Sequence, residues 1–156
     1  MRLLPCVALT AAVLATPAWE TRPPDEILTV PFVDSRVDAL NGQRISVGGY
    51  LGECLGHECR LYATKEQFDR DKSWFAAAMA ANGRIDVPAP AIPAVGIGTG
   101  PDDDFDGKAA PFVPSYVIIT GAVTNRCRFN GVPDCTDRST DIEPEAIRAG
   151  GAPPAS

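Results

Sequence analysis

Four of the five cysteines and the only histidine are the residues best suited to chemistry in this 156-residue chain. Cys54, His57 and Cys59 lie close enough together to ligate one zinc ion, with Cys127 or Cys135 as a fourth donor. The same cysteines can instead form disulfides, which persist in oxidising compartments. The choice between these two chemistries depends on where the protein resides.

The N-terminus favours disulfides, because residues 1–18 have the order of a secretory signal peptide. Arg2 is followed by an apolar run, which ends at the small residues Thr16-Pro17-Ala18. Cleavage there would remove Cys6 and leave four thiols, for which three pairings exist. The preferred pairing closes two short loops, Cys54–Cys59 and Cys127–Cys135.

The cysteines and His57 are not expected to act in catalysis. A cysteine nucleophile beside His57 is not favoured, since both neighbouring thiols are expected to be oxidised. The sequence also has no nucleophile-elbow motif around a serine. We therefore expect a protein that is not an enzyme.

A second candidate site is the acidic run Asp102-x-Asp104-x-Asp106-Gly107, which matches the first half of a calcium-binding loop. The match fails at the last ligand position, where Val113 replaces the bidentate glutamate. Either a solvated acidic loop or a weak calcium site at Asp102, Asp104 and Asp106 is consistent with this pattern. We expect no other cofactor.

Charge and length narrow the class of protein. Removal of residues 1–18 leaves 138 residues, and the loss of Arg2 moves the net charge from −6 to −7. An acidic domain repels phosphate backbones, so nucleic acid is not an expected partner. No other segment is apolar for long enough to span a membrane. The sequence predicts one periplasmic or secreted domain with an unknown envelope ligand or protein partner.

The cysteines and His57 are positioned by a predicted β-hairpin over residues 42–64. Its first strand alternates apolar and small residues with the period of a half-buried strand, and Gly48-Gly49 predicts a bulge or barrel corner. Thr64 and Gln67 form a capping box that begins a helix, whose apolar residues are expected to face the core and plug one end of the sheet: Phe68, Phe75 and Met79. A lead-in over 19–36 includes a predicted edge strand at 27–33.

The second half of the chain repeats the combination of strand and cysteines. Residues 85–114 are rich in proline, glycine and aspartate and predict a long loop. A buried strand is predicted over 115–123, followed by a cysteine-closed turn over 126–137 and a last short element over 142–148. Residues 149–156 predict a flexible tail.

Two segments carry a resemblance to a known fold: Arg44-Ile-Ser-Val-Gly-Gly-Tyr-Leu51 and Tyr116-Val-Ile-Ile-Thr-Gly-Ala-Val123. With the capped helix, they resemble an oligonucleotide/oligosaccharide-binding (OB) barrel over residues 37–148, similar to small uncharacterised exported bacterial proteins. The resemblance implies a mainly β, α+β fold with one capped helix in a small disulfide-stapled barrel. In such a barrel the helix lies between the third and fourth strands.

The functional expectation is a non-catalytic binding or structural module of the cell envelope. Its ligand would be held by the hairpin bend, with Tyr50 and His57 as candidate contacts, together with the 85–114 loop. The alternative is a metal-binding envelope protein that uses the cysteine/histidine hairpin or the aspartate loop.

Overall fold

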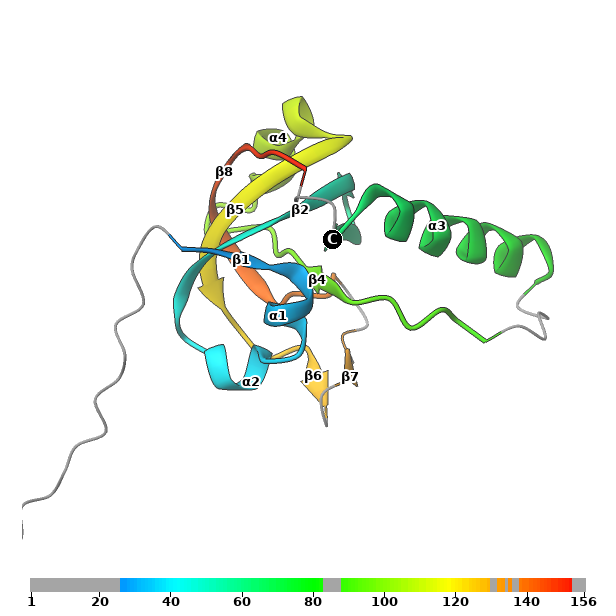
Figure 1. Cartoon of the computed structure of the whole chain (residues 1–156), viewed down its shortest axis with the longest axis horizontal. Helices are drawn as coiled ribbons and strands as arrows, with labels where there is room; N and C mark the ends of the chain where they lie inside the picture. Colours follow the sequence, from blue (N-terminus) through cyan, green and yellow to red (C-terminus); the bar gives the residue numbers. More distant parts are fainter. Residues whose placement is uncertain (1–25, 83–87, 130–131, 134, 136–137, 153–156) are drawn as a thin grey trace, which may run out of the picture.

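A six-stranded, mainly antiparallel sheet forms the body of the protein in the computed structural model, which describes residues 26–82, 88–129, 132–133, 135 and 138–152. Five strands lie in the order β4-β3-β2-β5-β8, and β1 pairs with β2 in parallel (Figure 1). The strands of this sheet are β1 Ile27–Thr29, β2 Arg44–Leu55, β3 Glu58–Tyr62, β4 Ala94–Gly96, β5 Ser115–Val123 and β8 Ile142–Ala149. β6 Arg128–Phe129 and β7 Val132–Pro133 form a separate two-stranded sheet. The helices are α1 Val30–Asp34, α2 Val37–Leu40, α3 Lys65–Ala80, α4 Phe105–Ala109 and the 3₁₀ helix η1 Ala110–Phe112.

The predicted hairpin and the predicted late strand are both present. β2 pairs with β3 on one side and with β5 on the other, in unbroken register from Arg44 to Leu51 against β5. The predicted bulge at Gly48-Gly49 is wrong, because the irregularity lies between Leu51 and Cys54 on the β3 side. Gly49 serves another purpose: a Cβ there would lie 2.5 Å from the carbonyl oxygen of Tyr62. It allows two neighbouring strands to approach closely.

The core lies against one face of this sheet. Its largest fully buried side chains come from the strands, from α1 and from α4, and include Leu51, Leu61, Ile97, Phe105, Ile119 and Ile142. Period-two alternation placed Ile45, Val47 and Leu51 of β2 on the buried face correctly, and the prediction of a buried strand over 115–123 is confirmed by β5. The prediction of a mainly β domain with a capped helix is confirmed at this level.

The sheet is not closed into a barrel. Its two edge strands meet at a single parallel bridge between Ile97 and Ile142, where the amide of Gly98 donates to the Ile142 carbonyl at 2.8 Å. The predicted 85–114 loop is also wrong where the chain is described, because it contains β4, α4 and η1. α4 buries Phe105 and Ala109, which makes this segment part of the core rather than a covering loop.

The N-terminal lead-in contains a shorter strand than predicted, and the last strand extends into the predicted tail. Only Ile27–Thr29 is a strand, and the chain then turns into α1, where Pro31 occupies the first turn. Proline is tolerated there because the amide it lacks has no helical partner. β8 extends to Ala149, and the Gly150 amide still donates to the Tyr116 carbonyl at 2.8 Å. The predicted signal peptide and residues 153–156 of the tail lie outside the described residues.

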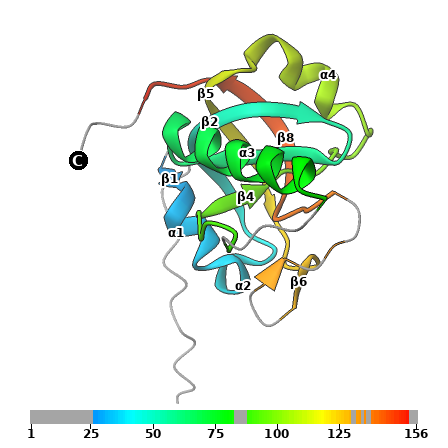
Figure 2. The same cartoon turned by 90° about the vertical axis from the view of Figure 1, so that its right-hand side faces the viewer.

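Helix α3 begins as predicted but does not plug the sheet. The Gln67 amide donates to Thr64 Oγ1 at 3.3 Å, and Gln67 Oε1 accepts from the Ala63 amide at 3.1 Å. None of its residues is fully buried, and Phe75 and Met79 are 56% and 64% exposed. Figures 1 and 2 show α3 standing out from the sheet as an arm, with residues 88–93 running back from its far end toward β4. In chain order the five-strand path consists of β2, β3, β4, β5 and β8, so α3 lies between its second and third strands and not between its third and fourth.

Two buried arginines tie the ends of the sheet to its loops. Arg128 donates to Asp141 through Nε at 2.7 Å and Nη2 at 2.9 Å, and its hydrogen bonds to Asp141 raise the pKa of its guanidinium. Arg138 donates from Nη1 to Asp106 at 2.5 Å and from Nε to the Ile97 carbonyl at 2.6 Å. Burying an arginine–carboxylate pair costs desolvation energy, which is offset only when the charged groups make all of their hydrogen bonds.

No helix among the described residues is long and apolar enough to cross a membrane.

Candidate ligand-binding groove

A groove opens between the β2–β3 hairpin, helix α3 and the chain that returns to β4. It has a volume of about 500 Å³. Outward-facing residues of the hairpin form one wall, one face of α3 forms the second, and residues 89–94 form the third. We call it the α3 groove, and its lining residues are Glu53, Glu58, Arg60, Tyr62, Asp71, Lys72, Trp74, Phe75, Ala89, Pro90, Ile92 and Ala94.

Local structure explains why these side chains converge. Successive residues of a strand point to opposite faces, so Glu58, Arg60 and Tyr62 share the outer face of β3 while Cys59 and Leu61 are buried in the core. On α3, Asp71 and Trp74 or Phe75 are three or four residues apart and therefore lie on one face of the helix.

An aromatic cluster fixes the base of α3 on the sheet. The ring of Phe68 lies 5.7 Å from that of Tyr50 and 5.6 Å from that of Tyr62, while Tyr50 also meets Tyr116 edge-on at 5.3 Å. These are favourable separations for aromatic pairs. Gly52 lies directly beneath Phe68, and a Cβ at this position would overlap the ring. The cluster therefore sets the position of the helical wall.

The polar groups of the groove fall into two sets. In the first set, Tyr62 donates its hydroxyl hydrogen to Asp71 Oδ2 at 2.7 Å, and Lys72 forms an ion pair with Glu53. Burial, and then the hydrogen bond to Asp71, raise the pKa of the Tyr62 phenol well above its ordinary value, so this hydroxyl remains a donor.

The second set consists of Glu58 and Arg60. Neither side chain forms a hydrogen bond or ion pair with any part of the chain that the structure describes, and both are exposed. Charged groups that are left free at the rim of an aromatic groove are available to a ligand. This combination of apolar walls and a few convergent polar groups is typical of ligand sites.

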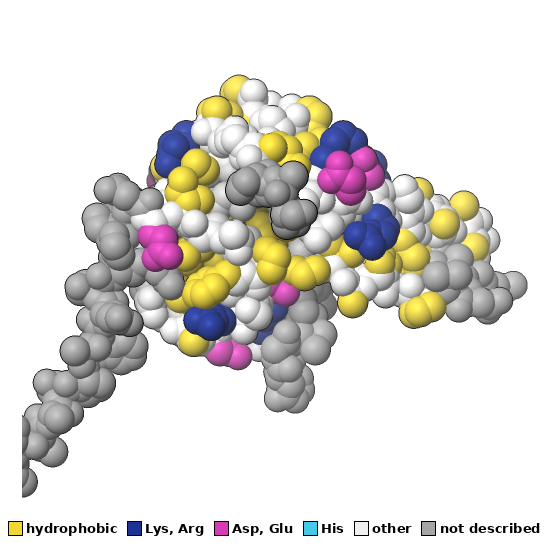
Figure 3. All heavy atoms as spheres, in the orientation of Figure 1, with side chains coloured by type: hydrophobic (Ala, Val, Ile, Leu, Met, Phe, Trp, Pro, Cys, Tyr) yellow, Lys and Arg dark blue, Asp and Glu magenta, His cyan; other side chains and the backbone are white. Residues whose placement is uncertain are grey.

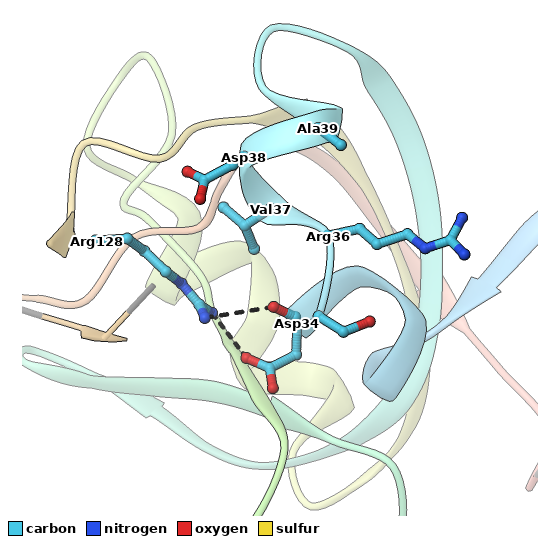
Figure 4. A pocket seen from close by; sticks show the side chains of 7 residues that line it. Asp34, Arg36, Val37, Asp38, Ala39 and Arg128 are labelled. Atoms are coloured by element: carbon cyan, nitrogen blue, oxygen red, sulfur yellow. Dashed lines mark hydrogen bonds and ion pairs between the residues drawn. The ribbon is translucent and has the colours of Figure 1, made fainter. Parts of the chain in front are cut away.

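A second pocket, of about 430 Å³, lies beside α1 and α2 and is lined by Asp34, Ser35, Arg36, Val37, Asp38, Ala39 and Arg128 (Figure 4). Its charges are engaged within the protein: Arg128 binds Asp34 at 2.9 Å, and Asp38 accepts from Asn125 at 3.0 Å. Arg36 points away from Arg128 and lies 4.4 Å from the centre of the Phe32 ring. These contacts give the pocket a structural role.

The candidate residues predicted from sequence do not form one site. Tyr50 is buried in the aromatic cluster beneath α3, whereas His57 is exposed at the hairpin bend seven residues further along. Neither of them lines the α3 groove, and sequence reasoning missed Tyr62, Asp71 and Trp74, which do. The alternation along β3 and the helical spacing on α3 were the signals that could have found them.

The disulfide prediction is confirmed: Cys54 is bonded to Cys59 and Cys127 to Cys135. The zinc alternative requires thiolates, and these four sulfurs provide none. Cys54 Sγ instead accepts a hydrogen bond from Arg138 Nη2 at 3.2 Å. The first disulfide is therefore packed against one of the buried arginines.

Two of the three aspartates of the predicted calcium loop have other partners within the protein. Asp104 pairs with Lys108 at 2.7 Å, while Asp106 binds Arg138 and accepts from the Gly56 amide at 3.0 Å. Asp102 is exposed. Within the described ranges, no group of three or more acidic, cysteine or histidine residues is placed to hold a metal ion. Calcium binding at Asp102, Asp104 and Asp106 stays a prediction without support from this geometry.

Comparison of the chain with protein-family models, with curated proteins and with solved structures finds no match in any of the three.

Proposed function

We propose that this chain is an exported, non-catalytic binding module of the cell envelope and that the α3 groove holds its ligand. The observation that carries the proposal is the groove itself, in which aromatic rings lie beside charged side chains that have no partner in the described chain. Phe75, which is 56% exposed, presents apolar surface to a ligand on the groove wall.

Several features support export and a binding role. Two disulfides are typical of proteins in oxidising compartments, in agreement with the proposed signal peptide at residues 1–18. The thiols that could have acted as nucleophiles are oxidised, and His57 stands alone at an exposed bend. A periplasmic or secreted location follows from this proposal.

We also propose that the sheet is an open variant of the OB arrangement. Its five-strand path and the bridge between Ile97 and Ile142 support this relation. Helix α4 supports it as well, because it lies between β4 and β5, which are the third and fourth strands of this path in chain order. OB folds bind ligands on the face of their second and third strands, which correspond here to β3 and β4, the strands beside the α3 groove. This part of the proposal rests on fold analogy.

Site-specific photo-crosslinking in the native envelope tests the binding role. A benzophenone amino acid replaces Phe75 in the groove or, as a matched control, Ile27, which is also an exposed hydrophobic residue but lies on β1. We expect a discrete crosslinked product from position 75, lost on Trp74→Ala, and none from position 27. Equal products from both positions, or none from position 75, would contradict the proposal.

A further inference from the structure

We infer that the α3 groove recognises an organic cation, namely an ammonium or guanidinium group carried on an apolar stem; this inference rests on the binding role proposed above. The first argument is the aromatic lining. Tyr62, Trp74 and Phe75 all line the groove, and aromatic rings attract cations. One such contact is already present beside it, because Lys72 Nζ lies 5.5 Å from the centre of the Phe68 ring.

The second argument is the charge balance of the lining. Three carboxylates face two cations, and Lys72 and Glu53 neutralise one another in an ion pair. Glu58 and Asp71 then remain against Arg60, which leaves one net negative charge in the groove. The net charge of −6 over the whole chain has the same sign. An anionic ligand would be repelled by both, whereas a cation would be attracted.

The third argument is the position of Asp71. Its Oδ2 is held by the Tyr62 hydroxyl at 2.7 Å, which fixes the carboxylate at the groove wall. Its Oδ1 accepts no hydrogen bond from any described residue and is available to a ligand. A carboxylate already oriented by one hydrogen bond loses little further freedom when it binds a cation. Asp71 is therefore the group that we assign to direct contact with the ligand cation.

Arg60 restricts which cations fit. It is an exposed cation on the groove wall without a partner in the described chain, so it disfavours ligands that carry several clustered positive charges. Its guanidinium donates readily to a carbonyl oxygen. A single cation next to a carbonyl, as in an arginine or lysine residue of a peptide, satisfies Asp71 and Arg60 together. A volume of about 500 Å³ accommodates such a group with its apolar stem.

Figure 3 shows hydrophobic side chains along the projecting arm, and both basic and acidic side chains where the arm meets the body. The arm therefore exposes apolar surface, of which Phe75 is a part that lines the groove.

Isothermal titration calorimetry with the oxidised, exported chain tests the inference. The cationic probes are Nα-acetyl-arginine amide, Nα-acetyl-lysine amide and choline; Nα-acetyl-glutamine amide and Nα-acetyl-glutamate amide are the neutral and anionic controls. We expect at least one cationic probe to bind roughly tenfold more tightly than both controls, and its affinity to fall as salt is raised. Tighter binding of the amino-acid amides than of choline would identify a peptide as the source of the cation, and the reverse would identify a small amine.

Two isosteric variants on the same helix test whether the cation binds in the α3 groove. Asp71→Asn keeps an acceptor for Tyr62 but removes the groove charge, whereas Asp69→Asn removes the charge of a carboxylate that pairs with Lys65 outside the groove. Affinity for the cation should fall about tenfold in Asp71→Asn and less than about twofold in Asp69→Asn. Circular dichroism checks that both variants are folded.

The inference fails, while the binding role stands, if a neutral or anionic probe binds as tightly as the cations, or if no probe binds although position 75 still crosslinks in the envelope. Equal losses in Asp71→Asn and Asp69→Asn would also overturn it, because attraction would then come from the general field of the protein.

Discussion

Replacing Asp141 by asparagine should destabilise the protein more than any surface charge change. The Asp141 carboxylate is 1% exposed and accepts three hydrogen bonds, from Arg128 Nε at 2.7 Å, from Arg128 Nη2 at 2.9 Å and from the Gly96 amide at 2.8 Å. Asparagine has the same shape but carries no charge, and its amide group is a donor. The two N–H groups of Arg128 and the Gly96 amide would therefore face a side chain with only one acceptor oxygen, and its NH₂ group would be an additional donor among them.

The cost can be worked out from the surroundings of Arg128. Breaking a buried ion pair costs about 3–5 kcal/mol, because the remaining charge is left buried without its partner. Here Asp34 still contacts Arg128 Nη2 at 2.9 Å and is 28% exposed, so it offsets part of the loss. We expect about 3 kcal/mol, which corresponds to a melting temperature lower by roughly 6–12 °C for a chain of this size.

Urea unfolding followed by circular dichroism measures this change, and Glu145→Gln is the matched control. Glu145 pairs with Arg44, but their side chains are 43% and 65% exposed, so its loss should cost no more than about 1 kcal/mol. With a slope of about 1.5–2 kcal/mol per molar urea, the midpoint of Asp141→Asn should fall by about 1.5–2 M. If the two variants unfold at the same urea concentration, the reasoning about a buried pair is wrong.

Three further predictions concern the groove and the disulfides. Gly52→Ala should displace Phe68 and loosen α3, which increased amide hydrogen exchange in the first turns of the helix would reveal; unchanged protection would contradict the packing argument. In an alkaline ultraviolet titration Tyr62 should ionise well above the ordinary pKa of a tyrosine, because burial and the hydrogen bond to Asp71 raise its pKa. Stability should fall as the pH rises above about 10, because the unfolded state then loses the proton that the native state keeps. Tyr62→Phe should remove that late transition, and its persistence in the variant would count against the assignment. Peptide mapping of the exported chain should find no free thiol and two short-range disulfides, each worth about 2–3 kcal/mol; a cross-pair would refute the connectivity.

The parts of the fold that were predicted correctly have strong local signals. The first half of β2 buries every second residue, and β5 contains a run of apolar residues that are buried together, so both read as strands in the sequence. The helix start at Thr64 depends on hydrogen bonds between residues three or four apart, which a short stretch of sequence contains in full. The two disulfides join cysteines five and eight residues apart, and this closeness along the chain is visible in the sequence itself.

The parts that were missed depend on contacts between distant segments. β4 is three residues long and exists because it pairs with β3, which no local pattern reveals. Phe75 and Met79 have helical spacing and were assigned to the core, but the sheet ends beneath the base of α3 and leaves them exposed. Helical periodicity identifies an apolar face without saying whether anything covers it.

The candidate site was missed for the same reason. Tyr62, Asp71 and Ile92 come from a strand, a helix and an irregular segment, and only the placement of α3 on its aromatic base brings them together. The sequence-based site included Tyr50, which lies on β2 next to the groove strand β3. The ring of Tyr50 is enclosed beneath Phe68 and does not line the groove.

The most direct test of the proposed site is an amide NMR titration of the isotope-labelled, oxidised chain with Nα-acetyl-arginine amide. We predict that the largest shifts fall on residues that line the α3 groove, with Arg60, Tyr62, Asp71, Trp74 and Ile92 foremost, and that Asp71→Asn reduces them while Asp69→Asn does not. Shifts concentrated at Asp34, Arg36 and Asp38 in the second pocket, or the absence of any localised shift, would contradict the assignment of the groove as the ligand site.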